Sequence, residues 1–425
     1  MKNAKAIKSK KIILFNQKQM CCGCEACVSA CTKQAIAMES DDYGFLYPTI
    51  DKELCIFCGI CKKVCAFQNV FEGNEPKVCY VACNKNEKQL GISSSGGAFS
   101  AIATDFLENG GVVFGATLDK ESNNKTDGER ELVPKHIAIH ELKDMVKLQG
   151  SKYVQSHIGD TYKEVKNYLL AGRRVLFSGT PCQIAGLKAF LHKKYEDLLT
   201  VDIICHGVPN ADFFKTYLSL LEKEMGGKII DFEFRDKTKG WKSMIGKATV
   251  KMKWGGVKTK TVYGDESSYY NLFLKGLILR ESCYECKYAC RNRPADITIG
   301  DYWGIEHEHS EILSDTKGPY SVEKGISCII VNTADGIKWI QKNRIRLHLV
   351  ESTFEKIGHK NGNLYHPCTK PQTWKNLMDI YSKEGYIGVD KYFYKKMGMQ
   401  IYFKKIKNCI PRNLKNAIKN YVKSS

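Results

Sequence analysis

Eight cysteines in two identically spaced groups constrain this chain more than any other feature. The first group has the spacing C-x2-C-x2-C-x3-C, and the second repeats it. Closely spaced cysteines in a reducing compartment serve as metal ligands or catalytic groups before they serve as disulfides. The chain has 19 cysteines in all, and their bunching indicates metal. The predicted ligands are Cys21, Cys24, Cys27, Cys31, Cys55, Cys58, Cys61 and Cys65.

This spacing is that of bacterial ferredoxins, which hold two 4Fe-4S clusters. The first three cysteines of a group ligate one cluster, and the fourth ligates the other. Two zinc sites are the alternative, but zinc prefers paired C-x2-C units with a longer loop between them. Cys22 is an additional cysteine, which we expect to bind no iron. The predicted ligand sets are Cys21, Cys24, Cys27 and Cys65, and Cys55, Cys58, Cys61 and Cys31.

The rest of the sequence predicts an α/β protein in which an N-terminal α+β ferredoxin domain precedes a larger α/β domain. Strand-like stretches (78–83, 112–116, 174–177, 201–205) alternate with helix-like ones (97–108, 161–170, 213–225). The predicted segments are a basic leader (1–14), the ferredoxin domain (15–70), a linker (71–77), the larger domain (78–330) and a C-terminal extension (331–425).

Charge and hydropathy limit where this chain works and what it contacts. No run of 18 apolar residues and no signal-like segment is present, which predicts a cytoplasmic protein. The formal net charge of +19 suits nucleic acid, anionic lipid or an acidic partner. The sequence lacks a recognised nucleic-acid-binding module, so we expect no nucleic-acid partner. Residues 412–423 form a basic amphipathic pattern, which suits peripheral contact with an anionic membrane, docking of a partner, or folding back.

Six further motifs carry a family resemblance. They are Ser93–Phe99 (SSSGGAF), Gln149–Val154 (QGSKYV), Phe177–Ile184 (FSGTPCQI) and Asp202–Pro209 (DIICHGVP), followed by Cys283-x2-Cys286-x3-Cys290 and Ala295–Gly304 (ADITIGDYWG). In this order they resemble the beta subunit family of coenzyme F-420 hydrogenase and dehydrogenase over about residues 78–330. The resemblance implies FAD, iron–sulfur clusters and reversible hydride exchange with a substrate such as coenzyme F-420.

The family resemblance implies that three of these motifs hold FAD. The Ser/Gly-rich turn before a helix suits the pyrophosphate, although a plain helix cap made by Ser95 is the alternative. Lys152 and Tyr153 would add a cation and a stacking surface, or they form an ordinary surface pair. A threonine at a strand end would hydrogen-bond the flavin ring, or only cap a tight turn. The predicted flavin-binding residues are Ser94, Ser95, Gly96, Gly97, Lys152, Tyr153 and Thr180.

A third 4Fe-4S cluster is expected beside the flavin. Cys283, Cys286 and Cys290 supply three thiolates, and Cys205 is the fourth predicted ligand, with Cys182 as the other candidate. A zinc site completed by a histidine, or a group of free thiols, is the alternative. His206 is the candidate proton donor, because histidine titrates near neutral pH. A structural role in its turn is the alternative for His206.

These patterns together predict an iron–sulfur flavoprotein oxidoreductase. FAD would exchange hydride with a small organic molecule, and the clusters would pass single electrons to or from a redox protein partner. One alternative keeps the chemistry but reduces a sugar, a nucleotide sugar or a tetrapyrrole. Another is an electron-carrier subunit without flavin.

Overall fold

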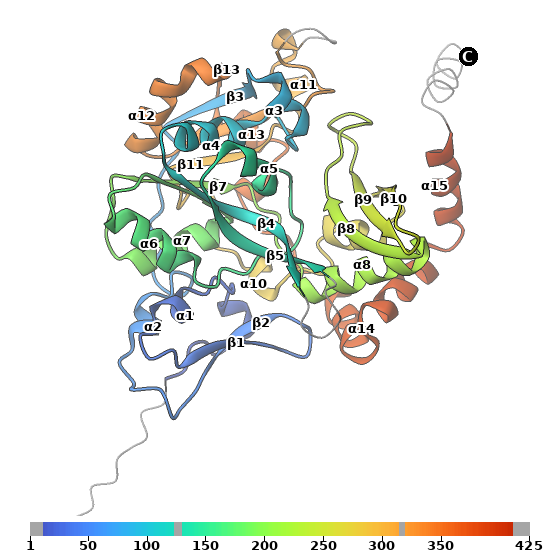
Figure 1. Cartoon of the computed structure of the whole chain (residues 1–425), viewed down its shortest axis with the longest axis horizontal. Coiled ribbons are helices and arrows are strands. Elements are labelled where there is room, and N and C mark those ends of the chain that lie inside the picture. Colours follow the sequence, from blue (N-terminus) through green and yellow to red (C-terminus); the bar gives the residue numbers. More distant parts are fainter. Residues whose placement is uncertain (1–11, 123–129, 314–318, 411–425) are drawn as a thin grey trace, which may run out of the picture.

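The computed structural model describes residues 12–122, 130–313 and 319–410, and its centre is an eight-stranded mixed sheet (Figure 1). Its strands are β3 (Val78–Asn84), β4 (Val112–Ser122), β5 (Arg130–Ile139), β6 (Val175–Gly179), β7 (Leu198–Ile203), β11 (Ile297–Asp301), β12 (Ser327–Val331) and β13 (Leu347–Ser352). They lie in the order β13-β3-β12-β11-β7-β6-β4-β5. The four strands β11, β7, β6 and β4 run parallel, and the outer pairs are antiparallel.

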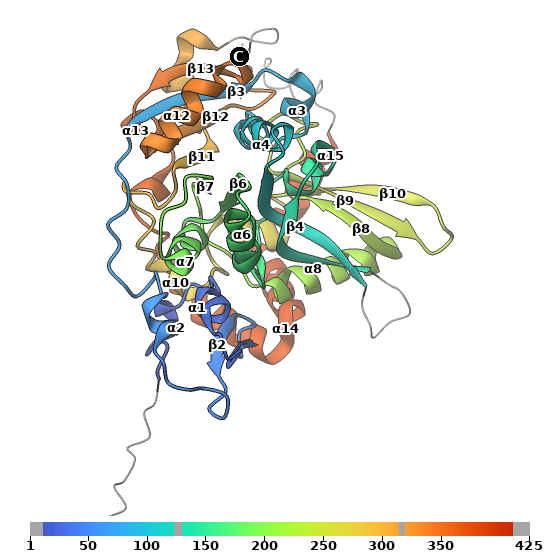
Figure 2. The same cartoon turned by 60° about the vertical axis from the view of Figure 1, so that its left-hand side comes forward.

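Helices cover both faces of this sheet (Figure 2). Helices α4 (Ala98–Glu108) and α12 (Ala334–Asn343) pack on one face, where Val113 and Leu176 are buried. Helices α6 (Thr161–Leu170) and α7 (Pro181–Leu191) pack on the other, against Phe114 and Phe177. Successive side chains of a strand point to opposite faces, so a strand that is covered twice needs a continuous apolar run. The parallel strands have such runs.

A smaller sheet with an aromatic core lies beside the large one. Its strands β8 (Gly227–Glu233), β9 (Ile245–Met252) and β10 (Val257–Tyr263) are antiparallel. Phe214, Tyr217, Phe232 and Tyr386 pack between this sheet and its helices. These helices are α8 (Ala211–Met225), α9 (Ser268–Leu274), α14 (Trp374–Met397) and α15 (Gln400–Cys409).

The N-terminal cysteine segment is built from a two-stranded sheet and short helices. These are η1 (Lys18–Met20), α1 (Ala26–Ala30), β1 (Ile36–Ser40), β2 (Leu46–Ile50) and α2 (Ile60–Lys63). The remaining short helices are α3 (Glu87–Ile92), η2 (Leu142–Asp144), α5 (Met145–Leu148), α10 (Glu281–Tyr284), α11 (Ile305–Glu308), η3 (Ser310–Ile312), η4 (Arg344–Arg346), α13 (Phe354–Gly358) and η5 (Gly362–Leu364).

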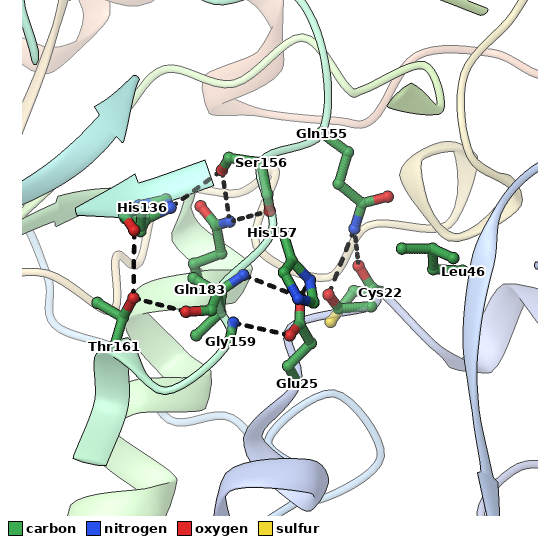
Figure 3. Close-up of polar contacts among 12 residues, drawn as sticks. Cys22, Glu25, Leu46, His136, Gln155, Ser156, His157, Gly159, Thr161 and Gln183 are labelled. Carbon is green, nitrogen blue, oxygen red and sulfur yellow. Dashed lines mark hydrogen bonds and ion pairs between the residues drawn. The ribbon is translucent and has the colours of Figure 1, made fainter. Parts of the chain in front are cut away.

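A buried carboxylate fastens the cysteine segment to the larger domain (Figure 3). Glu25 is 4% exposed, and its side chain accepts hydrogen bonds from the Ile158 and Gly159 amides, both at 2.9 Å. Its Oε1 also lies 2.8 Å from Nδ1 of His157. Helix α14 provides a second attachment for the cysteine segment, because Tyr43 Oη donates to Asp379 at 2.9 Å. The Tyr43 ring meets Trp374 edge-on at 5.7 Å.

Several predicted helix, strand and domain bounds can be compared with the observed ones. The helix predicted over 161–170 is α6, with the same bounds, and the strand predicted over 201–205 is β7, which starts at Leu198 and ends at Ile203. The large sheet continues past residue 330, where the larger domain was predicted to end, because β13 pairs with β3. Most of the leader and the tail pattern over 412–423 lie outside the described residues. No described helix has the length and apolar character needed to cross a bilayer.

Replacing Glu25 by alanine should destabilise the protein by about 3 kcal/mol, because two buried amides lose their acceptor. Glu25→Gln should lose less, since one carbonyl oxygen remains. Urea unfolding followed by circular dichroism would measure both. Glu39→Ala, on an exposed position of β1, is the matched control and should change little. Equal stability of the Glu25 and Glu39 variants would contradict this role.

Candidate functional site

A cavity of about 810 Å³ opens at the carboxyl ends of the parallel strands. Its wall includes the segments that follow β6, β7 and β11, which is where open α/β sheets bind ligands. Its volume lies within the range of cofactor and small-molecule sites, roughly 300–1,000 Å³. The predicted residues that line it are Ser94, Ser95, Gly97, Lys152, Tyr153, Thr180, Cys205, His206, Cys283 and Cys286.

The Ser/Gly turn leaves the first turn of α4 facing this cavity. Gly97 is the N-cap of α4, with φ 76°, and no side chain caps the helix. Ser95 therefore does not cap α4, and its hydroxyl donates to the Ile326 carbonyl at 2.9 Å. Ala98 and Phe99 line the cavity beside Gly97. An uncapped helix N-terminus suits an anionic group such as a phosphate.

Gly96 is the one predicted flavin residue outside the cavity wall. A Cβ at this position would collide with the Ala82 carbonyl and the Ser327 amide, because the turn crosses β3 and β12 closely. The Gly96 carbonyl accepts from the Asn84 amide at 2.7 Å. Gly96 therefore serves the packing of the turn, and its neighbours form the surface.

Lys152 lines the cavity, and its side-chain amine has an unusual pKa. Its Nζ donates to the carbonyls of Gln149 and Gly150, at 2.7 and 3.2 Å. Burial lowers the pKa of Lys152 to about 7. The neighbouring Tyr153 stacks on Phe273 with ring centroids 4.7 Å apart, so one face of its ring is already covered.

Thr180 and Gln183 form a capping box at the start of α7, in which the Thr180 amide donates to Gln183 Oε1 at 3.0 Å. The Thr180 hydroxyl lies 3.1 Å from both Gln183 Oε1 and Cys182 Sγ. The Thr180 hydroxyl therefore contacts residues of its own turn at the start of α7.

Several buried polar atoms of the cavity wall have no partner within the described structure. They belong to Gln149 (Oε1), Arg235 (Nε), Ser282 (Oγ), Tyr288 (Oη) and Arg293 (Nε). Buried polar atoms are normally hydrogen-bonded, so unpaired ones on a cavity wall suit a polar ligand. Together with the uncapped α4, they fit a dinucleotide such as FAD.

Four thiols line this cavity, those of Cys182, Cys205, Cys283 and Cys286. The predicted ligand set had Cys290 in place of Cys182. Burial raises the pKa of Cys205 and of Cys283, and the neighbouring thiols add to the effect. Cys182 and Cys286 are among those neighbours for both. Cys290 points away, and its Sγ donates to the Lys287 and Asn292 carbonyls at 3.2 Å.

This arrangement places Cys182, the other candidate, in the position expected of Cys290. The physical reason is that Cys182 lies in the first turn of α7, at the cavity, whereas the turn after α10 directs Cys290 outward. Among the described residues, no three of His, Cys, Asp or Glu converge closely enough to hold a single metal ion.

The thiol neighbours within the N-terminal segment agree with the crossed arrangement at Cys65. Burial raises the pKa of Cys27, and the next contributions come from Cys24, Cys21 and Cys65. Burial likewise raises the pKa of Cys61, whose thiol neighbours are Cys58 and Cys55. Cys65 from the second motif thus joins three cysteines of the first, as crossed ligation requires.

Cys22 connects the first of these groups to the cavity. It is buried beside the thiols of Cys182 and Cys24, and these contacts raise its own pKa. The same contacts lower the pKa of Cys24, and that of Cys182 to about 7. The residue that we expected to bind no iron therefore lies between the two sets of thiols.

His206 has a partner that the sequence analysis missed. The Cys368 thiol lies 3.8 Å from His206 Nε2 and donates to the His206 carbonyl at 3.1 Å. Asn363 Oδ1 lies 3.3 Å from His206 Nδ1. The bond to Cys368 is the main cause that raises the pKa of His206. The only sequence signal for this contact was Cys368 itself, a cysteine that lies outside the predicted larger domain.

Arg235 was also missed, because an isolated arginine in a strand-like stretch carries no motif. Its side chain is 2% exposed and lies on the cavity wall. Its Nη1 donates to Asp301 Oδ2 at 3.2 Å and to the Tyr153 hydroxyl at 3.3 Å. Trp303 lies beside it, stacked on Trp241 with centroids 4.8 Å apart.

Comparison with known proteins identifies two segments. Residues 172–356 match the family described as the C terminus of the Coenzyme F420 hydrogenase/dehydrogenase beta subunit. Residues 20–69 match the 4Fe-4S dicluster domain. The chain is similar to this beta subunit family. The resemblance drawn from the sequence motifs is confirmed, and the chain is an iron–sulfur protein of an oxidoreductase type.

Among solved structures, the chain is similar to one of the F420-reducing [NiFe] hydrogenase complex from Methanosarcina barkeri. The identity is 17%, over 77% of this chain and 95% of that chain, with a TM-score of 0.40. No curated protein matches the chain.

If Cys182, Cys205, Cys283 and Cys286 hold a third cluster, Cys182→Ser should lower the iron content by about four atoms per chain. Cys290→Ser is the matched control and should keep the full content. Iron analysis of both proteins, purified without oxygen, distinguishes the two ligand sets. Loss of iron in the Cys290 variant alone would restore the set expected from the sequence.

Proposed function

We propose that this chain is a cytoplasmic iron–sulfur flavoprotein oxidoreductase. Bound FAD would supply hydride exchange with an organic substrate, coenzyme F-420 or a similar compound, and the clusters would supply one-electron transfer to or from a protein partner. The observation that carries the proposal is the continuity through Cys22, which lines the cavity and lies beside the thiols of Cys24 and Cys182.

The residues of the cavity have separate roles in this proposal. The first turn of α4 and Lys152 would bind the pyrophosphate of FAD. Arg235 and Lys360 also line the cavity, and their positive charges suit an anionic substrate. His206 would hold a proton on its ring, oriented by Asn363 and Cys368.

The protein partner would meet the chain at the second cysteine group of the N-terminal segment. Cys58 is exposed, and apolar neighbours surround it in sequence. Leu54, Ile56 and Phe57 are 51%, 59% and 42% exposed. Exposed apolar side chains next to a cluster ligand suit a transient contact with a redox protein.

Flavin and iron content is the first test. Protein purified without oxygen should contain about one FAD and about twelve iron atoms per chain, from three clusters. The absorbance spectrum before and after denaturation measures flavin, and colorimetry measures iron. Reduced coenzyme F-420 should then bleach the bound flavin, and oxidised coenzyme F-420 should restore its absorbance. Iron for two clusters and no flavin after reconstitution would leave an electron-carrier subunit.

The affinity for FAD should depend on pH through Lys152. Its pKa of about 7 lies below the ordinary 10.5, so the free protein loses the positive charge as pH rises above 7, while a bound phosphate favours the charged form. Affinity should therefore be constant below about pH 7 and fall as the pH rises above 7, by at most about tenfold per pH unit, until Lys152 also loses its proton in the complex.

Lys152→Met should bind FAD more weakly and lose this pH dependence. Lys147→Met, on the preceding helix α5, is the control and should behave like the unaltered protein. Fluorescence titration of the apoprotein with FAD at several pH values measures both. An unchanged pH profile in the Lys152 variant would remove this lysine from the site.

A further inference from the structure

Helix α15 presents an apolar stripe to the outside of the molecule. Met399, just before the helix, and Tyr402, Phe403 and Ile406 within it are 72%, 66%, 66% and 61% exposed. Their spacing of i, i+3, i+4 and i+7 is that of one helical face. A surface helix normally turns such a stripe to the core. In α15 only Ile401 is buried.

The helix is nevertheless attached to the body of the protein. Asn408 donates to Asp265 and Glu266, each at 2.8 Å, and Ile401 is 6% exposed. The outward direction of the stripe is therefore set by packing on the opposite side of the helix. Figures 1 and 2 both place α15 far from the N-terminal cysteine segment.

The charged side chains of α15 itself have one sign. No acidic residue follows Asp390 in the sequence. Lysines flank the stripe on α15 and at the end of α14. They are Lys395, Lys396, Lys404, Lys405 and Lys407. Aromatic and aliphatic side chains bordered by lysines are the composition of helices that lie in the interface of an anionic bilayer.

We propose that α15 is a docking surface for an anionic membrane, with Tyr402, Phe403 and Ile406 inserted at the headgroup level and the lysines on acidic lipids. Anionic lipid is the occupant that the charge favours, because a second copy of this face would bring like charges together. A single short helix gives reversible binding. The position of α15 leaves the exposed Leu54–Cys58 segment free for a redox partner.

Vesicle sedimentation of the full-length protein tests this surface. The protein should bind vesicles of equimolar phosphatidylglycerol and phosphatidylcholine, bind phosphatidylcholine vesicles poorly, and dissociate at high salt. Ile406→Ser should weaken binding about tenfold, because an inserted aliphatic side chain is lost. Lys404→Gln with Lys405→Gln should reduce the preference for the anionic vesicles.

Ile345→Ser is the matched control, because Ile345 is 79% exposed between Arg344 and Arg346 and does not belong to α15. It should bind as the unaltered protein does. Equal binding to both vesicle types, or equal losses in the two isoleucine variants, would overturn the proposal. So would an unchanged affinity of the Ile406 variant, or dimerisation in solution that Ile406→Ser abolishes.

Discussion

The position of the N-terminal cysteines relative to the cavity depends on the buried carboxylate of Glu25. This residue lies inside the first cysteine motif and has a left-handed backbone, with φ 61°. Its hydrogen bonds hold that strained conformation against the segment before α6. Arg280 acts from the other side, where its Nε donates to the Cys21 carbonyl at 2.8 Å. One cysteine group is thus fixed to the same arginine that directly precedes α10, the helix that carries the cavity cysteine Cys283.

Under the proposed function, this fixed geometry would let the cysteine groups and the cavity work together. Electron transfer needs short separations that persist, and loosely tethered domains do not supply them. Arg280 is fully buried, and its guanidinium also donates to the Leu46 carbonyl at 2.9 Å. Buried charges and their partners are costly to separate. The cysteine segment is therefore a built-in part of the larger domain.

Local patterns in the sequence predicted much of the fold and part of the site. The bounds of α6 follow from apolar residues at helical spacing, and the strands of the parallel sheet from short apolar runs. The crossed cysteine groups follow from the spacing alone. Contacts between distant segments were beyond such patterns. Cys368 meets His206 across 162 residues, and the placement of α7 brings Cys182 near Cys283.

The contact between Tyr43 and α14 has a consequence for biosynthesis. The ribosome delivers the cysteine segment before the larger domain, and Asp379, which binds Tyr43, emerges 336 residues after it, shortly after Trp374, which covers the Tyr43 ring. Arg280 also arrives long after the cysteines that it contacts. The cysteine segment therefore completes its packing only after the larger domain has been synthesised. Any insertion of clusters during synthesis would find these cysteines most accessible before that domain is made.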